Sequence, residues 1–116
     1  MGIFQNSGIR QAVLAATLTL TVSATMVRAQ EATYALTIHE DRFEPSTITV
    51  PAGAKIQLRI TNATKGSAEF ESAELNREKV VPAGQTTTVF VGPLSPGSYP
   101  FFNDFKQTTR GRLIAK

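Results

Sequence analysis

Apolar and polar residues alternate along most of the chain after its first 30 positions, with the two-residue period of β-strands. The alternation is clearest at 33–38 and 56–61, where every second residue is aliphatic or aromatic, and β-branched or aromatic runs follow at 86–91 and 98–102. Because successive side chains of a strand point to opposite faces, this period predicts strands with one buried face. No 3.6-residue period persists, so we expect nothing more helical than one turn at 75–79.

Proline and glycine separate these segments. The tetrad Val-Pro-Ala-Gly occurs at 50–53 and again at 81–84, and a third turn is expected at 93–97. Proline presets the first backbone angle of a turn and glycine accepts the left-handed one, so we interpret both tetrads as turns and not as an internal repeat. About seven or eight short strands spaced by 8–12 residues predict one all-β domain, a sandwich or barrel.

The first 29 residues have the plan of a secretory signal peptide. Arg10 precedes an apolar stretch, and a Val-Arg-Ala tripeptide ending at Ala29 places small residues where signal peptidase reads them. We expect cleavage after Ala29, a folded domain at 30–116 and export to the periplasm. The alternative is an uncleaved membrane anchor, which is disfavoured by the 17 residues between Arg10 and Arg28 and by the threonines among them.

Charge and composition exclude several function classes. Removing Arg10 and Arg28 lowers the Lys plus Arg count from 12 to 10 against 9 acidic residues, so the net charge falls from +3 to +1. A nucleic-acid-binding protein would instead carry a basic stripe. The chain has no cysteine, which excludes thiol catalysis, iron–sulfur clusters, thiolate zinc and every copper–thiolate centre.

Few residues suggest a site. His39 is the only histidine and lies beside Glu40 and Asp41, so it is either a metal ligand or a surface residue at a strand end. No nucleophile elbow or phosphate-binding loop is recognisable, which argues against an ordinary hydrolase.

A group of acidic residues offers a second candidate. On a strand, Glu69 and Glu71 would lie on the same face, and adjacent carboxylates repel unless a cation or a basic partner compensates. Hard cations and iron favour such oxygen-rich sites. The alternative is a solvated strand edge that faces Arg77 and Lys79.

The order of motifs resembles that of the cupredoxins. Phe43-Glu44-Pro45, followed by Ile-Thr-Val-Pro-Ala-Gly at 48–53, resembles the opening of bacterial members. Gly-Ser-Tyr-Pro-Phe-Phe at 97–102 resembles the aromatic strand that precedes the ligand loop in this family. Gly-Arg-Leu at 111–113 resembles the strand that follows the loop. The resemblance spans residues 34–116 and implies a Greek-key β-sandwich.

The same resemblance implies that the blue-copper ligands are lost. Type 1 copper needs two imidazoles and a thiolate, with a weak axial thioether. The short ligand loop of the family, C-x-x-H-x-x-M, places Asn103, Lys106 and Thr109 at the cysteine, histidine and methionine positions, and the upstream histidine falls near Glu69. We therefore expect no type 1 copper and no electron transfer through a copper–thiolate bond.

A narrower resemblance concerns metal uptake. Segments 69–72, 75–80 and 92–94 are similar to periplasmic cupredoxins associated with iron-permease uptake systems, and Glu-Phe-Glu also occurs in the EfeO-type cupredoxin-like domain. This resemblance implies a copper or iron ion bound by carboxylates. The implied ligands are Glu69, Glu71 and Asp104, with Asp41 and His39 as further candidates.

Lys106 occupies the position at which the similar periplasmic cupredoxins have the histidine of their ligand loop. Its ammonium repels a metal unless it is turned away or deprotonated, and a salt bridge from Lys106 to Glu69 or Glu71 would replace the ion.

Three hypotheses remain open. The first is an accessory protein of periplasmic iron or copper uptake that hands its ion to a membrane iron permease. The second is a metal-free interaction module that presents Arg77, Glu78 and Lys79 to a protein partner. Catalytic oxidoreduction is expected least, because no soft ligand remains to tune a redox metal.

Overall fold

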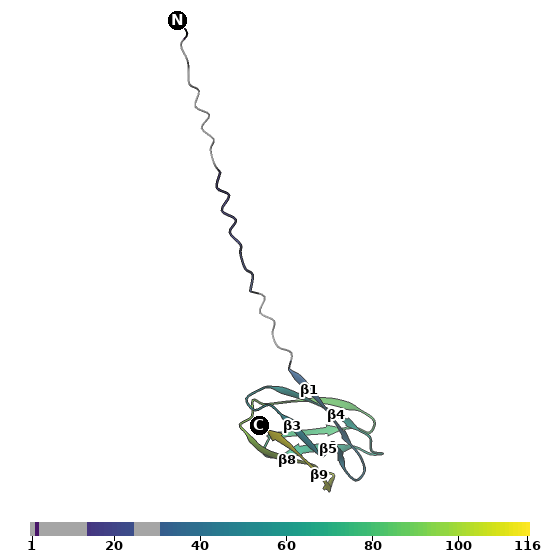
Figure 1. Cartoon of the computed structure of the whole chain (residues 1–116). Coiled ribbons are helices and arrows are strands. Elements are labelled where there is room, and N and C mark those ends of the chain that lie inside the picture. Colours follow the sequence, from purple (N-terminus) through teal and green to yellow (C-terminus); the bar gives the residue numbers. More distant parts are fainter. Residues whose placement is uncertain (1, 3–13, 25–30) are drawn as a thin grey trace.

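Nine strands form a β-sandwich in residues 31–116 (Figure 1). The computed structural model describes residues 2, 14–24 and 31–116. The strands are β1 (Ala32–Ile38), β2 (Phe43–Glu44), β3 (Thr47–Val50), β4 (Ile56–Asn62), β5 (Ala68–Ser72), β6 (Arg77–Val81), β7 (Thr86–Val91), β8 (Gly97–Asn103) and β9 (Lys106–Ala115). The predicted all-β sandwich is confirmed, with nine strands where about seven or eight were expected.

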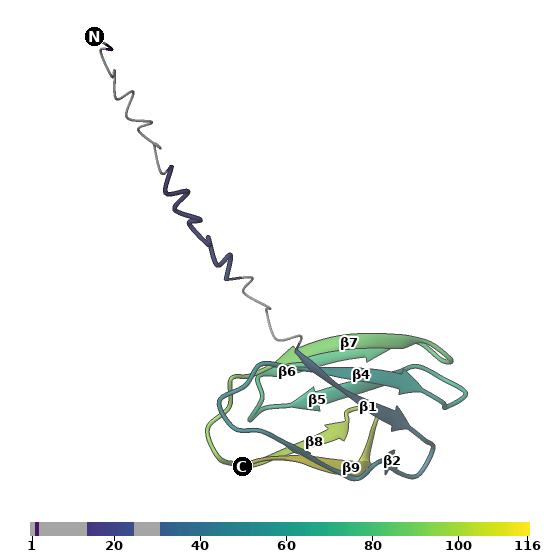
Figure 2. The ribbon, with the colours of Figure 1, turned by 45° about the horizontal axis from the view of Figure 1, so that its top comes forward.

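The strands divide into two mixed sheets (Figure 2). The first sheet has the order β2-β1-β4-β7 and the second has the order β3-β9-β8-β5-β6. The pairs β1–β4 and β3–β9 are parallel, and the other pairs are antiparallel. The chain therefore crosses between sheets several times, which brings segments far apart in sequence side by side.

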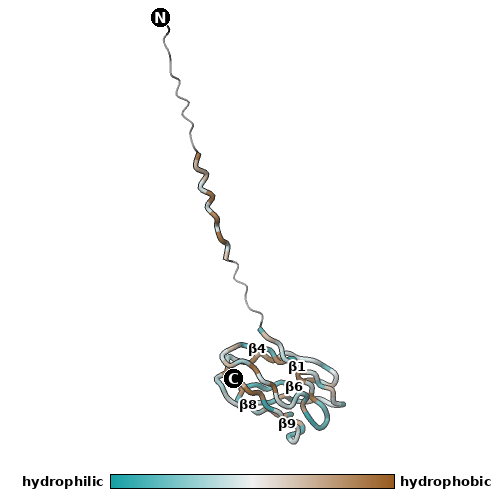
Figure 3. The backbone as a smooth tube through the Cα atoms, viewed as in Figure 1, coloured by the Kyte–Doolittle hydropathy of each residue, from teal (hydrophilic) through white to brown (hydrophobic). Residues whose placement is uncertain are grey.

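The core lies between the two sheets and contains a cluster of aromatic rings. Phe43 and Phe101 meet edge to face with ring centroids 4.9 Å apart, and Phe70 lies 5.2 Å from Phe101. All three side chains are buried. Apolar and polar positions interleave along the strands (Figure 3), as expected where one face of each sheet packs inward.

The turn chemistry follows the sequence prediction. Gly53 and Gly84, which end the two Pro-Ala-Gly turns, have φ values of 77° and 72°, the left-handed region that glycine enters without steric cost. Asn62, buried at the end of β4, donates to the carbonyls of Gly66 and Val81 and accepts from the backbone and hydroxyl of Thr64. This network fixes the loop that leads from β4 into β5.

The segment expected as a helical turn has a different structure. Residues 73–76 form a turn in which Asn76 has a φ of 52°, and the chain then enters β6 at Arg77. Pairing with β5 overrides the weak local preference for a helical turn, because each residue of β6 from Arg77 to Val81 faces a partner on β5.

The amino-terminal segment forms none of the nine strands in its described part. Residues 14–24 are exposed, including Leu14, Leu18 and Leu20. The expected cleavage after Ala29 lies outside the described residues. Within the part of the chain that the structure describes, there is no helix of the length and apolarity needed to cross a membrane.

Candidate metal-binding site

Strand β5 presents two glutamates on the outer face of its sheet. Ala68, Phe70 and Ser72 are buried on the core side, so the intervening Glu69 and Glu71 point the other way. Glu69 is nevertheless only 6% exposed, whereas Glu71 is half-buried. An ionisable side chain this buried normally needs a compensating partner.

Asp104 joins the two glutamates from the turn between β8 and β9. Phe70 is paired with Asn103 across β5 and β8, and the Asp104 amide donates to the Glu69 carbonyl at 2.9 Å, which continues this ladder by one residue. Asp104 thereby lies across from Glu69, and ligand oxygens of Glu69, Glu71 and Asp104 all lie within 4.8 Å of one another. Gln107 donates to the Asp104 carboxylate at 3.2 Å.

A fourth carboxylate reaches the cluster from β6. Glu78 is the cross-strand partner of Glu71, so both side chains project from the same face. The sequence suggested Glu78 as a partner-binding residue beside Arg77 and Lys79, and not as a member of the acidic cluster. The sequence feature that could have revealed this fourth carboxylate is the short β5–β6 hairpin, because its register places residues 71 and 78 opposite each other.

Proton sharing is the main electrostatic feature of this cluster. A hydrogen bond with the Glu78 carboxyl, burial, and repulsion from the Glu78, Asp104 and Glu71 carboxylates raise the pKa of Glu69 to about 7. Burial is the leading cause that raises the pKa of Glu71, followed by repulsion from Asp104 and Glu78 and a hydrogen bond with Asp104. Without a cation, the surroundings of Glu69 and Glu71 thus favour the protonated form of both side chains.

No basic side chain of the described residues pairs with this cluster. The ion pairs of residues 31–116 join His39 to Glu44, and Arg42 to Asp41 and Glu44. His39 and Asp41, both expected as further ligands, are therefore engaged with other residues and do not belong to the group around Glu69.

Lys106 is turned away from the carboxylates. Its ammonium donates to the backbone carbonyl of Glu40, so the salt bridge to Glu69 or Glu71 considered from the sequence is absent among the described ion pairs. Because Glu40 follows β1 in the opposite sheet, this contact ties the β8–β9 turn to the first loop and leaves the acidic cluster without a compensating cation.

The side chains at the positions aligned with blue-copper ligands differ in orientation and surroundings. Asn103 shares the core side of the sheet with Phe70, while Glu69 points to the outer side. The Asn103 carboxamide oxygen accepts from the backbone amides of Glu69 and Phe105 at 3.0 and 3.1 Å. Thr109 is buried, and its hydroxyl has no hydrogen-bond partner among the described residues. With no thiolate, thioether or imidazole among them, these side chains do not fit type 1 copper.

The residues expected at a partner surface have separate surroundings. The Arg77 guanidinium donates to the Phe90 carbonyl of β7 at 2.8 Å and to the Asn76 carbonyl, which links the edge strands of the two sheets. Glu78 lies with the acidic cluster, and Lys79 is exposed on β6. All three residues are exposed, with Glu78 on one face of β6 and Arg77 and Lys79 on the other.

Comparisons with known proteins agree with this fold. The family model described as a cupredoxin-like domain matches residues 11–115. An uncharacterized protein of Rickettsia prowazekii (strain Madrid E) is 42% identical over 79 residues, which cover 68% of this chain and 63% of the relative. The chain thus spans less than two thirds of that relative's length.

Solved structures with similar folds include several copper proteins. The metal-binding domain of the Cu(I)-exporting P-type ATPase CopA of Streptococcus pneumoniae D39 superposes with a TM-score of 0.65 at 13% identity, covering 72% of this chain and 84% of that one. Auracyanin A, a blue copper protein of Chloroflexus aurantiacus, gives 0.63 at 13% identity over 74% and 99%. Amicyanin of Paracoccus versutus gives 0.58 at 16% identity over 76% and 83%.

At these identities the solved structures establish the fold alone. The family model, in contrast, matches nearly the whole chain, and its description agrees with the nine-stranded sandwich. The chain is therefore a member of the cupredoxin-like domain family.

Proposed function

We propose that this protein binds a metal ion through the carboxylates of Glu69, Glu71 and Asp104, with Glu78 available as a fourth ligand. The supporting observation is the convergence of three ligand oxygens within 4.8 Å at a site where Glu69 is 6% exposed and no basic side chain of the described residues forms an ion pair. A bound cation would remove the mutual repulsion of these groups and replace the protons that they share.

The donor atoms favour a hard ion. All four candidate ligands offer oxygen, which suits Fe(III), Mn(II), Mg(II) or Ca(II), whereas Cu(I) prefers thiolate and thioether ligands. After the leader the chain has neither cysteine nor methionine. The sequence suggests iron or copper. Iron fits these oxygen ligands better than Cu(I), so Cu(II) is the form of copper to test.

Calorimetric titration of the mature protein with Cu(II), Fe(II) and Fe(III) tests the metal site. We expect saturable binding that weakens by more than tenfold in Glu69→Gln and in Glu71→Gln, because each substitution removes one anionic ligand. Glu31→Gln is the matched control, since Glu31 lies outside the cluster and its substitution should leave the affinity unchanged. Heats that match buffer for every ion would exclude the site.

The cellular role forms a further part of the proposal. We infer that the protein works in the periplasm and delivers its ion to a membrane iron permease. The inference is supported by the leader-like sequence and by the resemblance of 69–72 and 75–80 to periplasmic uptake cupredoxins. Fractionation of cells that express the whole chain should recover a form lacking residues 1–29 in the periplasm, whereas retention in the inner membrane would indicate an anchor.

The metal-free interaction module is the competing function. Capture of partners from the native envelope separates the two, using wild-type protein, Glu69→Gln and Lys79→Ala. If the permease is recovered by wild-type protein and lost on chelation or in Glu69→Gln, the metal carries the interaction. Recovery that survives chelation but depends on Lys79 would support the metal-free module.

A further inference from the structure

A row of side chains connects the acidic cluster to an arginine on the outer face of the second sheet. The strand register places Glu78, Glu71, Phe102 and Arg110 opposite one another in successive strands β6, β5, β8 and β9. Neighbouring strands lie about 4.8 Å apart, so the backbone at Arg110 is about 10 Å from that at Glu71. Phe102 is the only residue between them in this row.

Arg110 lies against Phe102 but has no acidic partner among the described residues. Its guanidinium carbon is 5.3 Å from the centroid of the Phe102 ring, a cation–π distance. Residues 31–116 offer it neither an ion pair nor a side-chain hydrogen bond. All the N–H donors of the Arg110 guanidinium therefore remain available to a ligand, beside the proposed metal site.

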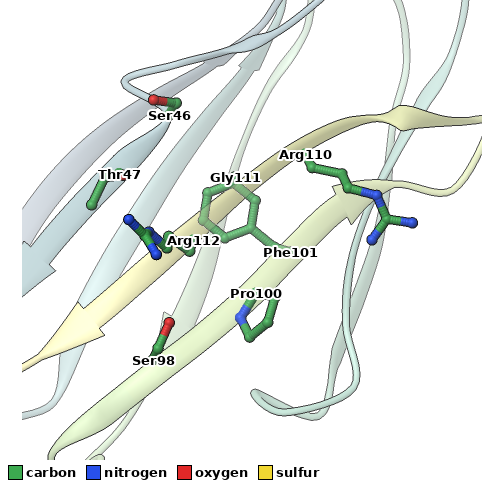
Figure 4. A pocket seen from close by; sticks show the side chains of 8 residues that line it. All are labelled: Ser46, Thr47, Ser98, Pro100, Phe101, Arg110, Gly111 and Arg112. Carbon is green, nitrogen blue, oxygen red and sulfur yellow. The ribbon is translucent and has the colours of Figure 1, made fainter.

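The other arginine of this strand face has a different position. Arg112 lies two residues further along β9, opposite Pro100, and both Arg112 and Arg110 line an open pocket of about 400 Å³. Figure 4 shows that the guanidinium groups of Arg110 and Arg112 are directed away from each other. The two arginines share the lining of this pocket, but only Arg110 is in the row that leads to Glu71, because Arg112 pairs with Pro100.

We propose that the metal ion is bound together with a small oxyanion, a carboxylate or a phosphate, whose outer oxygens are held by Arg110. This inference rests on the proposed metal site. Three or four protein carboxylates leave positions open on an ion that prefers six oxygen ligands. An oxyanion fills such a position with one oxygen while its other oxygens accept the paired N–H groups of a guanidinium.

The arrangement also explains a charge problem. The proposed ion would face four acidic groups, those of Glu69, Glu71, Asp104 and Glu78. A further anion beside these groups is unfavourable unless a second cation lies nearby. Arg110 supplies this charge from the far side of Phe102, where it does not compete for the carboxylates. The apolar ring keeps the guanidinium and the glutamates apart.

Metal affinity measured with and without an added oxyanion tests the inference. The mature protein is titrated calorimetrically with Fe(II), under exclusion of oxygen, and with Cu(II), in a non-coordinating buffer. Separate arms contain sodium acetate, sodium phosphate or sodium perchlorate at equal ionic strength. We expect acetate or phosphate to tighten binding by about tenfold relative to perchlorate, a coupling of ordinary size.

Two arginine variants locate the anion. Arg110→Gln should bind the ions in perchlorate but lose the enhancement, whereas Arg112→Gln should keep it. Equal enhancement in Arg110→Gln and wild type, or affinities that do not depend on the anion, would overturn the oxyanion inference and leave the metal site intact. Absence of ion binding in every arm would overturn both proposals.

Discussion

At the residue scale, the Asn103 side chain contacts the backbone amide of Glu69 and not its carboxylate. Asn103 holds the Glu69 amide on one side and the Phe105 amide on the other, so a single carboxamide oxygen fixes the start of β5 relative to the β8–β9 turn. The turn carries Asp104, which must lie beside Glu69 for the cluster to form. Asn103 is thus a positioning residue for the candidate site.

Replacing Asn103 by alanine should destabilise the protein by about 1–3 kcal/mol, because two backbone donors lose their acceptor at a buried position. Urea denaturation followed by circular dichroism measures the change. Thr108→Ala, at an exposed position of β9, is the control and should alter stability by less than about 0.5 kcal/mol. Equal stability of Asn103→Ala and wild type would contradict the role assigned to this amide.

The raised pKa of Glu69 predicts how the stability of the metal-free protein depends on pH. The folded state keeps a proton on Glu69 up to about pH 7, whereas the unfolded chain releases it near 4.5. The folded state therefore binds more protons between these values, and its free energy of unfolding should fall as the pH rises through this window. Glu71, whose pKa is also raised, acts in the same direction.

Urea midpoints at pH 5 and pH 8 check this dependence. Glu69→Gln cannot ionise at this position, so it should lose less stability than wild type between the two pH values. Glu74→Gln is a control from the same segment but outside the cluster, and it should behave like wild type. A wild-type protein that is more stable at pH 8 than at pH 5 would contradict the proton-sharing arrangement.

At the element scale, β5 is the strand on which the candidate site depends. It pairs with β6 on one side and β8 on the other. Glu78 of β6 and Asp104 of the turn after β8 bring carboxylates to the face that carries Glu69 and Glu71. Its core side, with Phe70, packs against Phe101 of β8. The same strand therefore contributes to the aromatic core and to the acidic cluster.

The packing of β8 against β9 depends on a glycine. A methyl group at Gly111 would lie 2.7 Å from Cζ of Phe101 and 2.9 Å from the Ser46 carbonyl oxygen, and Figure 4 shows the Phe101 ring against this position. Both distances are shorter than van der Waals contact allows, so the buried ring has to move. The close approach of two strands at Gly111 is what seats Phe101 in the core.

Gly111→Ala should therefore cost about 1–3 kcal/mol through overpacking. Gly97→Ala is a suitable comparison in β8, because its added methyl would meet the Tyr99 side chain at 3.7 Å and the Ser95 carbonyl oxygen at 4.0 Å, both ordinary contacts. Chemical denaturation of both variants gives the difference. If the two substitutions have equal effects, Phe101 is not constrained by Gly111 as described.

At the scale of the whole molecule, the core draws on both sheets but on none of the described residues before β1. The buried apolar side chains run from Leu36 to Ala115, whereas the described residues 14–24 are exposed. The outer face of the second sheet carries acidic groups over β5 and β6 and the two arginines of β9. A bound cation would thus stabilise the fold from outside the core.

A metal ion that binds only the folded state should raise the free energy of unfolding by about 2.7 kcal/mol at one hundred times its dissociation constant. Denaturation of the mature protein with and without the ion identified by calorimetry measures this gain. Glu69→Gln and Glu71→Gln should show less of it at the same ion concentration. A gain that persists unchanged in both variants would place the ion elsewhere on the molecule.

Some properties of this protein depend on local sequence alone. The strand period, the two Pro-Ala-Gly turns and the absence of cysteine predicted an all-β domain without type 1 copper, because alternation and turn angles are set by neighbouring residues. The common face of Glu69 and Glu71 was predictable for the same reason, since both lie two residues apart on one strand.

Other properties were decided only by the tertiary structure. The register of β5 with β6 brought Glu78 to the cluster, and the pairing of His39 with Glu44 removed the one imidazole from it. Lys106 turned to the Glu40 carbonyl, although its place in the chain suggested a salt bridge with the glutamates. Asp104 met Glu69 across 35 positions of sequence, and no local pattern encodes such a contact. Which strands become neighbours, and in which register, follows from packing two sheets around one core, and this packing decided which carboxylates would share a site.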